Sequence, residues 1–220
     1  MSDSARNVIL DSIRKALGRN RELDASIVTA LESRLNDCGP HVLPVFDEPL
    51  VERFVAKLES VHATTSRVGG VADIAAAIDG YICTHGLATN IVAARGALLD
   101  NIDWPAAYRI EHRGATVDDV VAITEALAGI VETGTLVCGS SESHPTSLNF
   151  LPENHIVVFT ESRLYKHMED VWRELRRLPG GLPRAVNLIT GPSKTADVEQ
   201  TIQYGAHGPR RFHVIIIAQP

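Results

Sequence analysis

The stretch that indicates the fold most directly is Val186-Asn187-Leu188-Ile189-Thr190-Gly191-Pro192-Ser193-Lys194-Thr195. Residues 186–190 predict a β-strand and residues 194–204 a helix, so the five residues from Gly191 are predicted to form a strand-to-helix loop. Working outward, apolar strands are predicted at residues 155–159 and 212–218, and a long helix at residues 162–177. Apolar strands that alternate with helices are typical of an α/β fold, in which a mainly parallel sheet has helices on both faces.

The rest of the chain extends this pattern and adds a helical arm. Apolar residues spaced four apart predict two N-terminal helices, so we expect an N-terminal helical arm over residues 1–40 and an α/β domain over residues 41–220. A strand pair broken at Gly134 is predicted within residues 129–138. The remaining predicted elements are helices near residues 50–58, 74–82 and 117–127, and strands near residues 64–68, 91–94 and 108–110.

Composition excludes several classes of protein. Of the 220 residues, 45% are apolar and 22% are charged, which is typical of a globular chain, and the net charge of −6 disfavours a nucleic-acid-binding protein. Cys38, Cys83 and Cys138 are far apart in the sequence, so neither a disulfide framework nor an iron–sulfur cluster is expected. The histidines show no metal-ligand spacing, no segment is long enough to span a membrane, and no signal peptide is visible. We therefore expect a cytoplasmic protein with no metal and no cofactor of its own.

The predicted strand-to-helix loop is the first candidate site. A helix start offers free backbone N–H groups and a partial positive charge, which attract anions. Gly191 allows close approach, Ser193 and Thr195 add hydroxyl groups, and Lys194 adds a cation, so these residues are candidates for binding a small anionic ligand. The loop is not a Walker A motif, because Leu188 and Ser193 stand where that motif needs glycines. Equally open is a plain helix cap with Lys194 in solvent.

A second candidate site is Glu132-Thr133-Gly134-Thr135. A glycine between two threonines inside a strand pattern indicates a bulge or the close approach of a ligand. Glu132 is a candidate catalytic acid, base or nucleophile, and Thr133, Gly134 and Thr135 are candidate ligand-binding residues. The alternative is a twisted strand whose Glu132 points into water.

A third candidate site is the turn His207-Gly208-Pro209-Arg210-Arg211. His207 and Gly208 are candidate ligand-binding residues, since a histidine can titrate near neutral pH, and the arginines can pair with carboxylates. The alternative is a basic surface turn. In open α/β sheets, ligands gather at the carboxyl ends of strands, so we expect residues 133–135 and 193–195 to converge there.

Four motifs that occur in a fixed order carry a family resemblance. They are Glu132-Thr133-Gly134-Thr135-Leu136, Leu151-Pro152-x-x-His155-Ile156-Val157-Val158, Gly191-Pro192-Ser193-Lys194-Thr195-Ala196-Asp197-Val198-Glu199 and Gly205-x-His207-Gly208-Pro209. In this order they resemble the LUD-domain family, strongly over residues 117–217 and more weakly over residues 45–116. The resemblance implies a fold similar to the NagB/RpiA/CoA-transferase group. It also implies a role in oxidising L-lactate to pyruvate beside two iron–sulfur partner proteins.

Three functions remain open at this point. The first is a cluster-free component of a multi-subunit, iron–sulfur complex that oxidises L-lactate, which is what the resemblance implies. The second is an independent enzyme acting on a phosphorylated or acyl-activated small molecule, with Glu132 as acid, base or nucleophile and Lys194 neutralising substrate charge. The third is a regulatory module that binds a small molecule without turnover.

Overall fold

The structure is a computed structural model that describes residues 3–18, 23–36, 42–197 and 200–218. The chain divides into two compact units, Met1–Leu43 and Pro44–Pro220. The predicted boundary at residues 40 and 41 lies outside the described residues.

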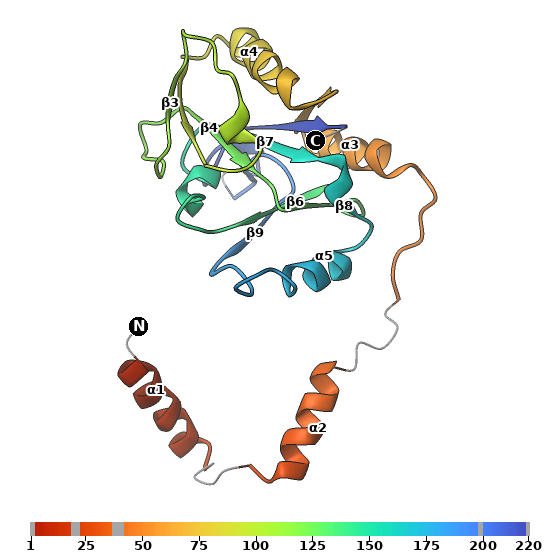
Figure 1. Cartoon of the computed structure of the whole chain (residues 1–220), viewed down its shortest axis with the longest axis vertical. Coiled ribbons are helices and arrows are strands. Elements are labelled where there is room, and N and C mark those ends of the chain that lie inside the picture. The colour runs from red at the N-terminus through yellow and green to blue at the C-terminus, as the bar shows by residue number, and fades with distance from the viewer. Residues whose placement is uncertain (1–2, 19–22, 37–41, 198–199, 219–220) are drawn as a thin grey trace. The chain divides into compact units, whose positions relative to one another are not determined.

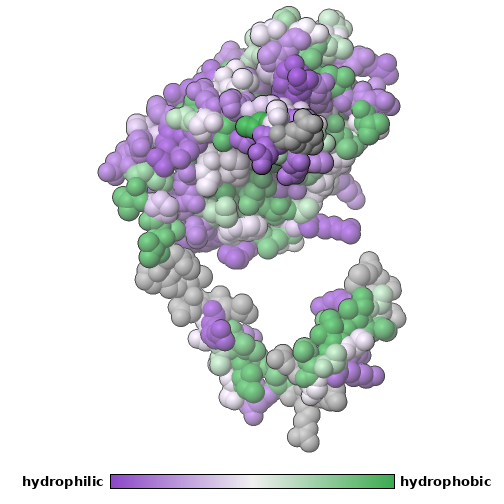
Figure 2. Space-filling view, turned by 180° about the vertical axis from the view of Figure 1, so that it is seen from behind, coloured by the Kyte–Doolittle hydropathy of each residue, from purple (hydrophilic) through white to green (hydrophobic). Residues whose placement is uncertain are grey.

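The N-terminal unit consists of the two helices that the apolar spacing predicts, α1 (Asp3–Ala16) and α2 (Ala25–Asn36). Apolar side chains on both helices are exposed, and they gather along the helices in the space-filling view of Figure 2. They include Val8, Ile9, Ile13, Leu17, Ile27, Val28 and Leu31. Among the described residues, every buried apolar residue lies at Phe46 or beyond, so the core belongs to the second unit.

The second unit is built on a six-stranded sheet in which every neighbouring pair is parallel. The sheet order is β1-β12-β7-β4-β2-β3, with bounds β1 Thr64–Val68, β2 Asn90–Ala93, β3 Arg109–Glu111, β4 Val121–Glu125, β7 Asn154–Thr160 and β12 Arg211–Ile217. The central strands β4, β7 and β12 are mostly apolar and almost entirely buried, because both faces of a parallel sheet are covered. This confirms the predicted α/β fold with a mainly parallel sheet.

Alternate residues of strand β7 pack on opposite faces of the sheet. Ile156 and Val158 belong to the core cluster that includes helix α4 (Ile74–His85). Phe159 belongs to the other cluster, where its ring lies 5.4 Å from that of Phe54 on helix α3 (Leu50–Ser60). Helices therefore flank both faces, as predicted, and Figure 1 shows α4 on the side of the sheet away from α5.

A second sheet, of four strands, packs against the same face of the first sheet as helix α3 does. Its order is β8-β5-β6-β9, with β5 Ala128–Ile130, β6 Thr135–Gly139, β8 Leu164–Tyr165 and β9 Val186–Ile189. Strands β5 and β6 form the predicted antiparallel pair, and Gly134 joins them with a φ of 69°. Helix α5 (Met168–Leu175) packs on this sheet through Val171 and Leu175. The sheet was not predicted as a separate layer.

Three predicted helices differ from the structure. Residues 117–127 contain strand β4, because Val121, Ala122 and Ile123 form a buried apolar run, and such a run fits a strand as well as a helix. Residues 162–177 form a short 3₁₀ turn and strand β8 before α5 begins. Residues 194–197 and 200–204 form no helix: strand β10 (Lys194–Thr195) pairs with β11 (Gln203–Tyr204) instead. The short 3₁₀ helices of the described chain, including that turn, are η1 Val71–Asp73, η2 Leu99–Asn101, η3 Thr146–Asn149 and η4 Glu161–Arg163.

Candidate functional site

Glu132, the predicted acid or base, pairs with a histidine. Its Oε2 lies 2.6 Å from His167 Nδ1, and because a carboxylate only accepts, Nδ1–H is the donor. Glu132 follows strand β5, and its backbone N–H donates to the carbonyl of Lys166, which brings the two residues together. The side chains are only 17% and 12% exposed, so the contact is largely protected from water. No sequence pattern pointed to His167, which is 35 positions away from Glu132.

The threonines around Gly134 form a short chain of hydroxyl contacts. Thr133 Oγ1 lies 2.7 Å from Thr135 Oγ1, which in turn lies 2.9 Å from Thr190 Oγ1. Thr190 directly precedes Gly191, so the second candidate site and the predicted loop meet at one end of the small sheet. The two segments thus approach each other through Thr190, whereas a contact of residues 133–135 with residues 193–195 stays a prediction.

Two glycines of this region lie against the end of helix α3. A Cβ atom on Gly134 would lie 2.5 Å from Lys57 Cβ, and one on Gly191 would lie 2.8 Å from Val61 Cγ2. Both positions thus need glycine for packing against protein. No ligand is required to explain these glycines.

The predicted loop at residues 191–195 is not a strand-to-helix loop. The backbone N–H of Ser193 donates to the carbonyl of Pro209, and the N–H of Gly205 donates to the carbonyl of Ser193. These bonds tie the loop to the turn that holds His207 and Gly208, and a Cβ on Gly208 would lie 3.3 Å from Ser193 Cβ. The first and third candidate sites are therefore neighbours. The helix start that motivated an anion site is missing, because the backbone continues into β10.

Lys194 is exposed, and Thr195 is half-buried, in this hairpin. Thr195 Oγ1 donates to Asp197 Oδ2 at 2.8 Å and accepts from the backbone N–H of Asp197. Thr195 therefore stabilises its own turn and does not cap a helix, whereas Lys194 is exposed to solvent, as the alternative predicted. The last two residues of the Gly191 motif, Val198 and Glu199, lie outside the described residues.

The predicted sites converge at the amino ends of the parallel strands, and this part of the expectation was wrong. Pro209 precedes the start of β12, and Val61 lies between α3 and the start of β1. The carboxyl ends lie at the opposite edge, where Ala93, Glu125 and Thr160 end β2, β4 and β7. Antiparallel strand β6 connects the two regions, with Thr135 at one end and Gly139 at the other.

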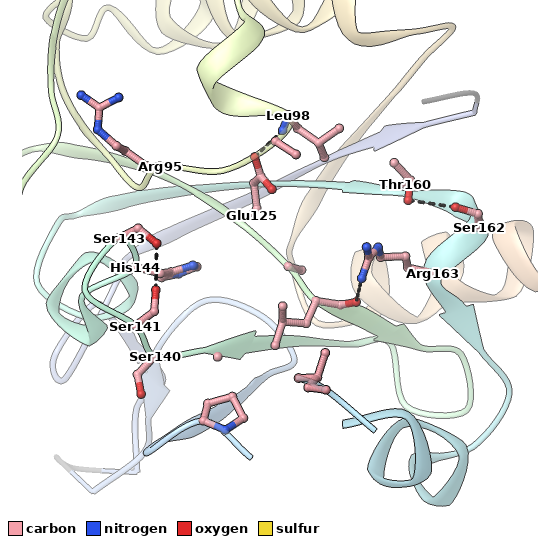
Figure 3. Close-up of a pocket in the computed structure, with 16 residues that line it drawn as sticks. Arg95, Leu98, Glu125, Ser140, Ser141, Ser143, His144, Thr160, Ser162 and Arg163 are labelled. Atoms are coloured by element: carbon pink, nitrogen blue, oxygen red, sulfur yellow. Dashed lines mark hydrogen bonds between the residues drawn. The ribbon is translucent and has the colours of Figure 1, made fainter. Parts of the chain in front are cut away.

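A cavity of about 490 Å³ lies at those carboxyl ends. It is lined by residues that follow β2, β4, β6 and β7, and Figure 3 shows how they surround it. The residues with polar or charged side chains in this lining are Arg95, Glu125, Ser140, Ser141, Ser143, His144, Thr160, Ser162 and Arg163.

A sequence signal for this cavity was present. Arg95, the Ser140–Ser141 pair and Ser162–Arg163 each follow a strand that was predicted from its apolar residues. Polar residues directly after buried parallel strands are the ones that face the ligand crevice of an open α/β sheet. Because residues 117–127 were predicted as a helix, Glu125 could not be placed at a strand end.

Among the described residues, no three His, Cys, Asp or Glu side chains are grouped so that they could hold a metal ion. Within the same residues, no helix is both long and apolar enough to cross a membrane.

Comparison with known proteins gives a family match and several relatives. Residues 51–217 match a family model described as the LUD domain. The uncharacterized protein NMB1437 of Neisseria meningitidis is 36% identical over 128 residues, which are 56% of this chain and 55% of that protein. Lactate utilization protein C of Shouchella clausii is 31% identical over 163 residues, 73% of this chain and 69% of that protein.

Coverage of these relatives is partial. The protein of the same name from Bacillus subtilis is 32% identical over 119 residues, covering 53% of this chain and 50% of that protein. The chain thus spans about half the length of most of these curated relatives. Among solved structures, a DUF162 family protein from Deinococcus radiodurans matches with a TM-score of 0.55 and 18% identity, over 79% of this chain and 99% of that one. At this identity, the match shows a shared fold.

Proposed function

Because this chain belongs to the LUD-domain family, we propose that it serves lactate utilization as a component without an iron–sulfur cluster, beside iron–sulfur partner proteins that oxidise L-lactate to pyruvate. The observation that carries the proposal is the family match over residues 51–217, together with relatives named lactate utilization protein C. The alignment to the Shouchella clausii protein covers 73% of this chain, so the similarity extends through most of the α/β unit.

The placement of the cysteines supports a cluster-free role. Cys83 is exposed on helix α4, on one face of the parallel sheet, whereas Cys138 is buried in the core of the other face. Burial raises the pKa of Cys138 to about 12, which disfavours the thiolate that iron requires. Cys38 lies outside the described residues. The iron would therefore be held by the partner proteins.

Copurification tests this proposal. A tagged full-length chain, expressed in cells that contain the neighbouring iron–sulfur proteins, should retain protein-bound iron and acid-labile sulfide in the eluate. The same chain purified from cells without those partners should contain neither. Stoichiometric iron and sulfide in the chain purified alone would show that it holds a cluster, and would contradict the proposal.

A second candidate function is acid–base catalysis on a phosphorylated or acyl-activated small molecule, and the Glu132–His167 contact favours it. A carboxylate on Nδ1 fixes the ring orientation and leaves Nε2 as the basic nitrogen, which is the arrangement of many catalytic histidines. The hydroxyls of Thr133 and Thr135 lie on the adjacent turn, and Lys194 would supply the cation for substrate charge.

Turnover measurements on paired variants separate this function from the first. Glu132→Gln should lower kcat by at least a hundredfold if Glu132 orients the base, and Lys194→Ala should mainly raise KM. Glu174→Gln, at an exposed ion pair on α5, is the matched control and should leave both constants unchanged. Equal activity of Glu132→Gln and wild type would remove this candidate.

A further inference from the structure

The cavity at the carboxyl ends of the parallel strands lies where the sheet topology creates a crevice. In the main sheet, the strand that follows β2 along the chain is β3, which lies on the outer side of β2. The next strand of this sheet after β4 is β7, which lies on the other side, toward the centre of the sheet. The loops after β2 and β4 therefore part, and this switch point is where open α/β sheets bind ligands. The volume of about 490 Å³ is typical of pockets that hold metabolite-sized molecules.

Arg163 brings an uncompensated positive charge to this cavity. Its Nη1 donates to the carbonyl of Leu127 at 3.4 Å, a long contact, and it forms no ion pair with a carboxylate of the described chain. Figure 3 shows its guanidinium pointing inward from one side. A planar guanidinium with most of its N–H groups available is suited to a carboxylate or phosphate.

Arg95 adds a second guanidinium at the rim. The backbone N–H of Arg95 donates to the carbonyl of Ser143, which fixes this residue against the loop on the other side of the crevice. Its side chain is 3.5 Å from Asp100 and is more than half exposed, so it can turn toward a bound anion.

Glu125 also faces the crevice, but its charge is held by protein. Its Oε1 accepts the backbone N–H groups of Leu98 and Leu99 at 2.6 and 2.7 Å. Two charge-assisted hydrogen bonds on one oxygen reduce repulsion toward a second anion. A Cβ on Gly96 would overlap the Glu125 carboxyl group, so the loop that carries Arg95 closes around this side chain.

Hydroxyl groups complete the polar wall on two sides. Ser141 Oγ lies 2.9 Å from Ser143 Oγ, and Thr160 Oγ1 lies 3.0 Å from Ser162 Oγ. Each pair shares one hydrogen, which leaves one O–H per pair that can donate to a ligand. Burial lowers the pKa of His144 below its ordinary value, which disfavours the charged form of this ring.

We propose that this cavity binds an organic metabolite through a carboxylate or phosphate group, with the exposed guanidinium of Arg163 as the main anchor, Arg95 as a second cation, and the two hydroxyl pairs donating to the same oxygens. The site is separate from the region of Glu132 and Gly191, which lies at the other end of strand β6. The proposal does not depend on the role in lactate utilization, since any metabolite with such a group fits the chemistry.

Calorimetric titration of the full-length chain tests the proposal, with L-lactate and inorganic phosphate as separate probes for the carboxylate and phosphate sources. At least one probe should bind, and Arg163→Gln should weaken its binding at least tenfold. Arg95→Gln should weaken it less, because the charge of Arg95 is already paired with Asp100. Arg177→Gln, at an exposed ion pair with Glu174 just after the end of α5, is the matched control and should bind as wild type does. A melting temperature close to that of wild type should accompany each variant.

The possible results of the titration distinguish a carboxylate ligand, a phosphate ligand and no ligand at this cavity. Binding of L-lactate that Arg163→Gln abolishes assigns a carboxylate ligand, and the same result with phosphate assigns a phosphate ligand. If neither probe binds at a concentration of about 10 mM, which exceeds the Kd of even a weakly bound metabolite, the proposal is overturned. So would binding that Arg163→Gln leaves unchanged while Lys194→Gln weakens it, because the anion would then lie at the hairpin. None of these results bears on whether iron–sulfur partners copurify.

Discussion

Glu132 Oε2 and His167 Nδ1 are 2.6 Å apart, in a contact that joins the turn after β5 to the start of helix α5. The two side chains are mostly shielded from water, and the His167 ring also lies 5.6 Å from the ring of Phe46. Through His167, the start of helix α5 therefore contacts both Glu132, after strand β5 of the small sheet, and Phe46, near the start of the α/β unit.

A double-mutant cycle measures this contact. Replacing Glu132 and His167 by glutamine, singly and together, should give a coupling energy of about 1–3 kcal/mol in urea unfolding, since the hydrogen bond involves a charged group in a shielded place. The same cycle on the exposed pair Arg177 and Glu174 should give less than about 1 kcal/mol. Equal coupling energies for the two pairs would mean that the Glu132–His167 contact is no stronger than a surface ion pair.

Gly134 should not tolerate a side chain. Gly134→Ala requires a non-glycine residue at a φ of 69° and places its Cβ 2.5 Å from Lys57 Cβ. Gly180→Ala has a φ of 90° but no atom within 4 Å of its Cβ, so it isolates the backbone cost. We expect the Gly134 variant to lose about 1–3 kcal/mol more stability than the Gly180 variant, which is the cost of overpacking. A difference near zero would show that α3 moves away freely.

The sequence predicted the main parallel sheet better than the identity of individual segments or the second sheet. Residues 155–159 and 212–218 are mainly apolar, with one histidine each, and the structure places both in central parallel strands. Residues 117–127 have the same character, but the acids before the run resemble a helix start. In the structure, Asp119 instead accepts from Arg113 and from the backbone of Thr116. This competition between side-chain contacts and helix capping is not visible in the sequence.

The candidate site was predicted only in part, for a related reason. The sequence predicted that residues 133–135 lie near the loop after the strand at 186–190, and Thr135 Oγ1 lies 2.9 Å from Thr190 Oγ1, just before that loop. The partner His167 and the cavity around Arg163 depend on how the second sheet packs on the first. No short pattern encodes that packing, because it arises from contacts between segments far apart in the chain.

Gly96 should be needed for the Arg95 loop to close around Glu125. Gly96→Ala would force its Cβ into the Glu125 carboxyl group and break the hydrogen bonds from Leu98 and Leu99. We expect a loss of about 1–3 kcal/mol in unfolding free energy. Gly80→Ala, inside helix α4 with open space around it, should instead be neutral or stabilising by about 0.5–1 kcal/mol. Equal effects of the two changes would contradict the described loop.

Acid should destabilise the α/β unit through buried histidines. Burial lowers the pKa of His155 to about 3 and that of His213 to about 4, from an ordinary value of 6.5. Between pH 6.5 and about 4, the unfolded chain therefore binds protons that the folded chain does not, so stability falls as the pH falls. Each histidine contributes up to about 1.4 kcal/mol per pH unit.

Urea unfolding at pH 7, 6 and 5 measures this slope. His213→Gln retains a group that can hydrogen-bond Thr64, which lies 2.8 Å from the His213 ring, but it cannot bind a proton. The unfolding free energy of the variant should therefore fall less steeply with falling pH than that of wild type. Between pH 6 and 5, the difference in slope should correspond to about one proton fewer taken up on unfolding. An identical slope in the two proteins would show that His213 stays unprotonated in both states or is already accessible to water when folded.

The most direct test of the proposed role is the rate of L-lactate oxidation by the purified iron–sulfur partner proteins, measured by reduction of an electron-accepting dye with and without the full-length chain. If the chain is a working component of lactate utilization, adding it in equimolar amount should raise the L-lactate-dependent rate, and the chain alone should give none. An L-lactate-dependent rate that is the same with and without the chain would contradict the account.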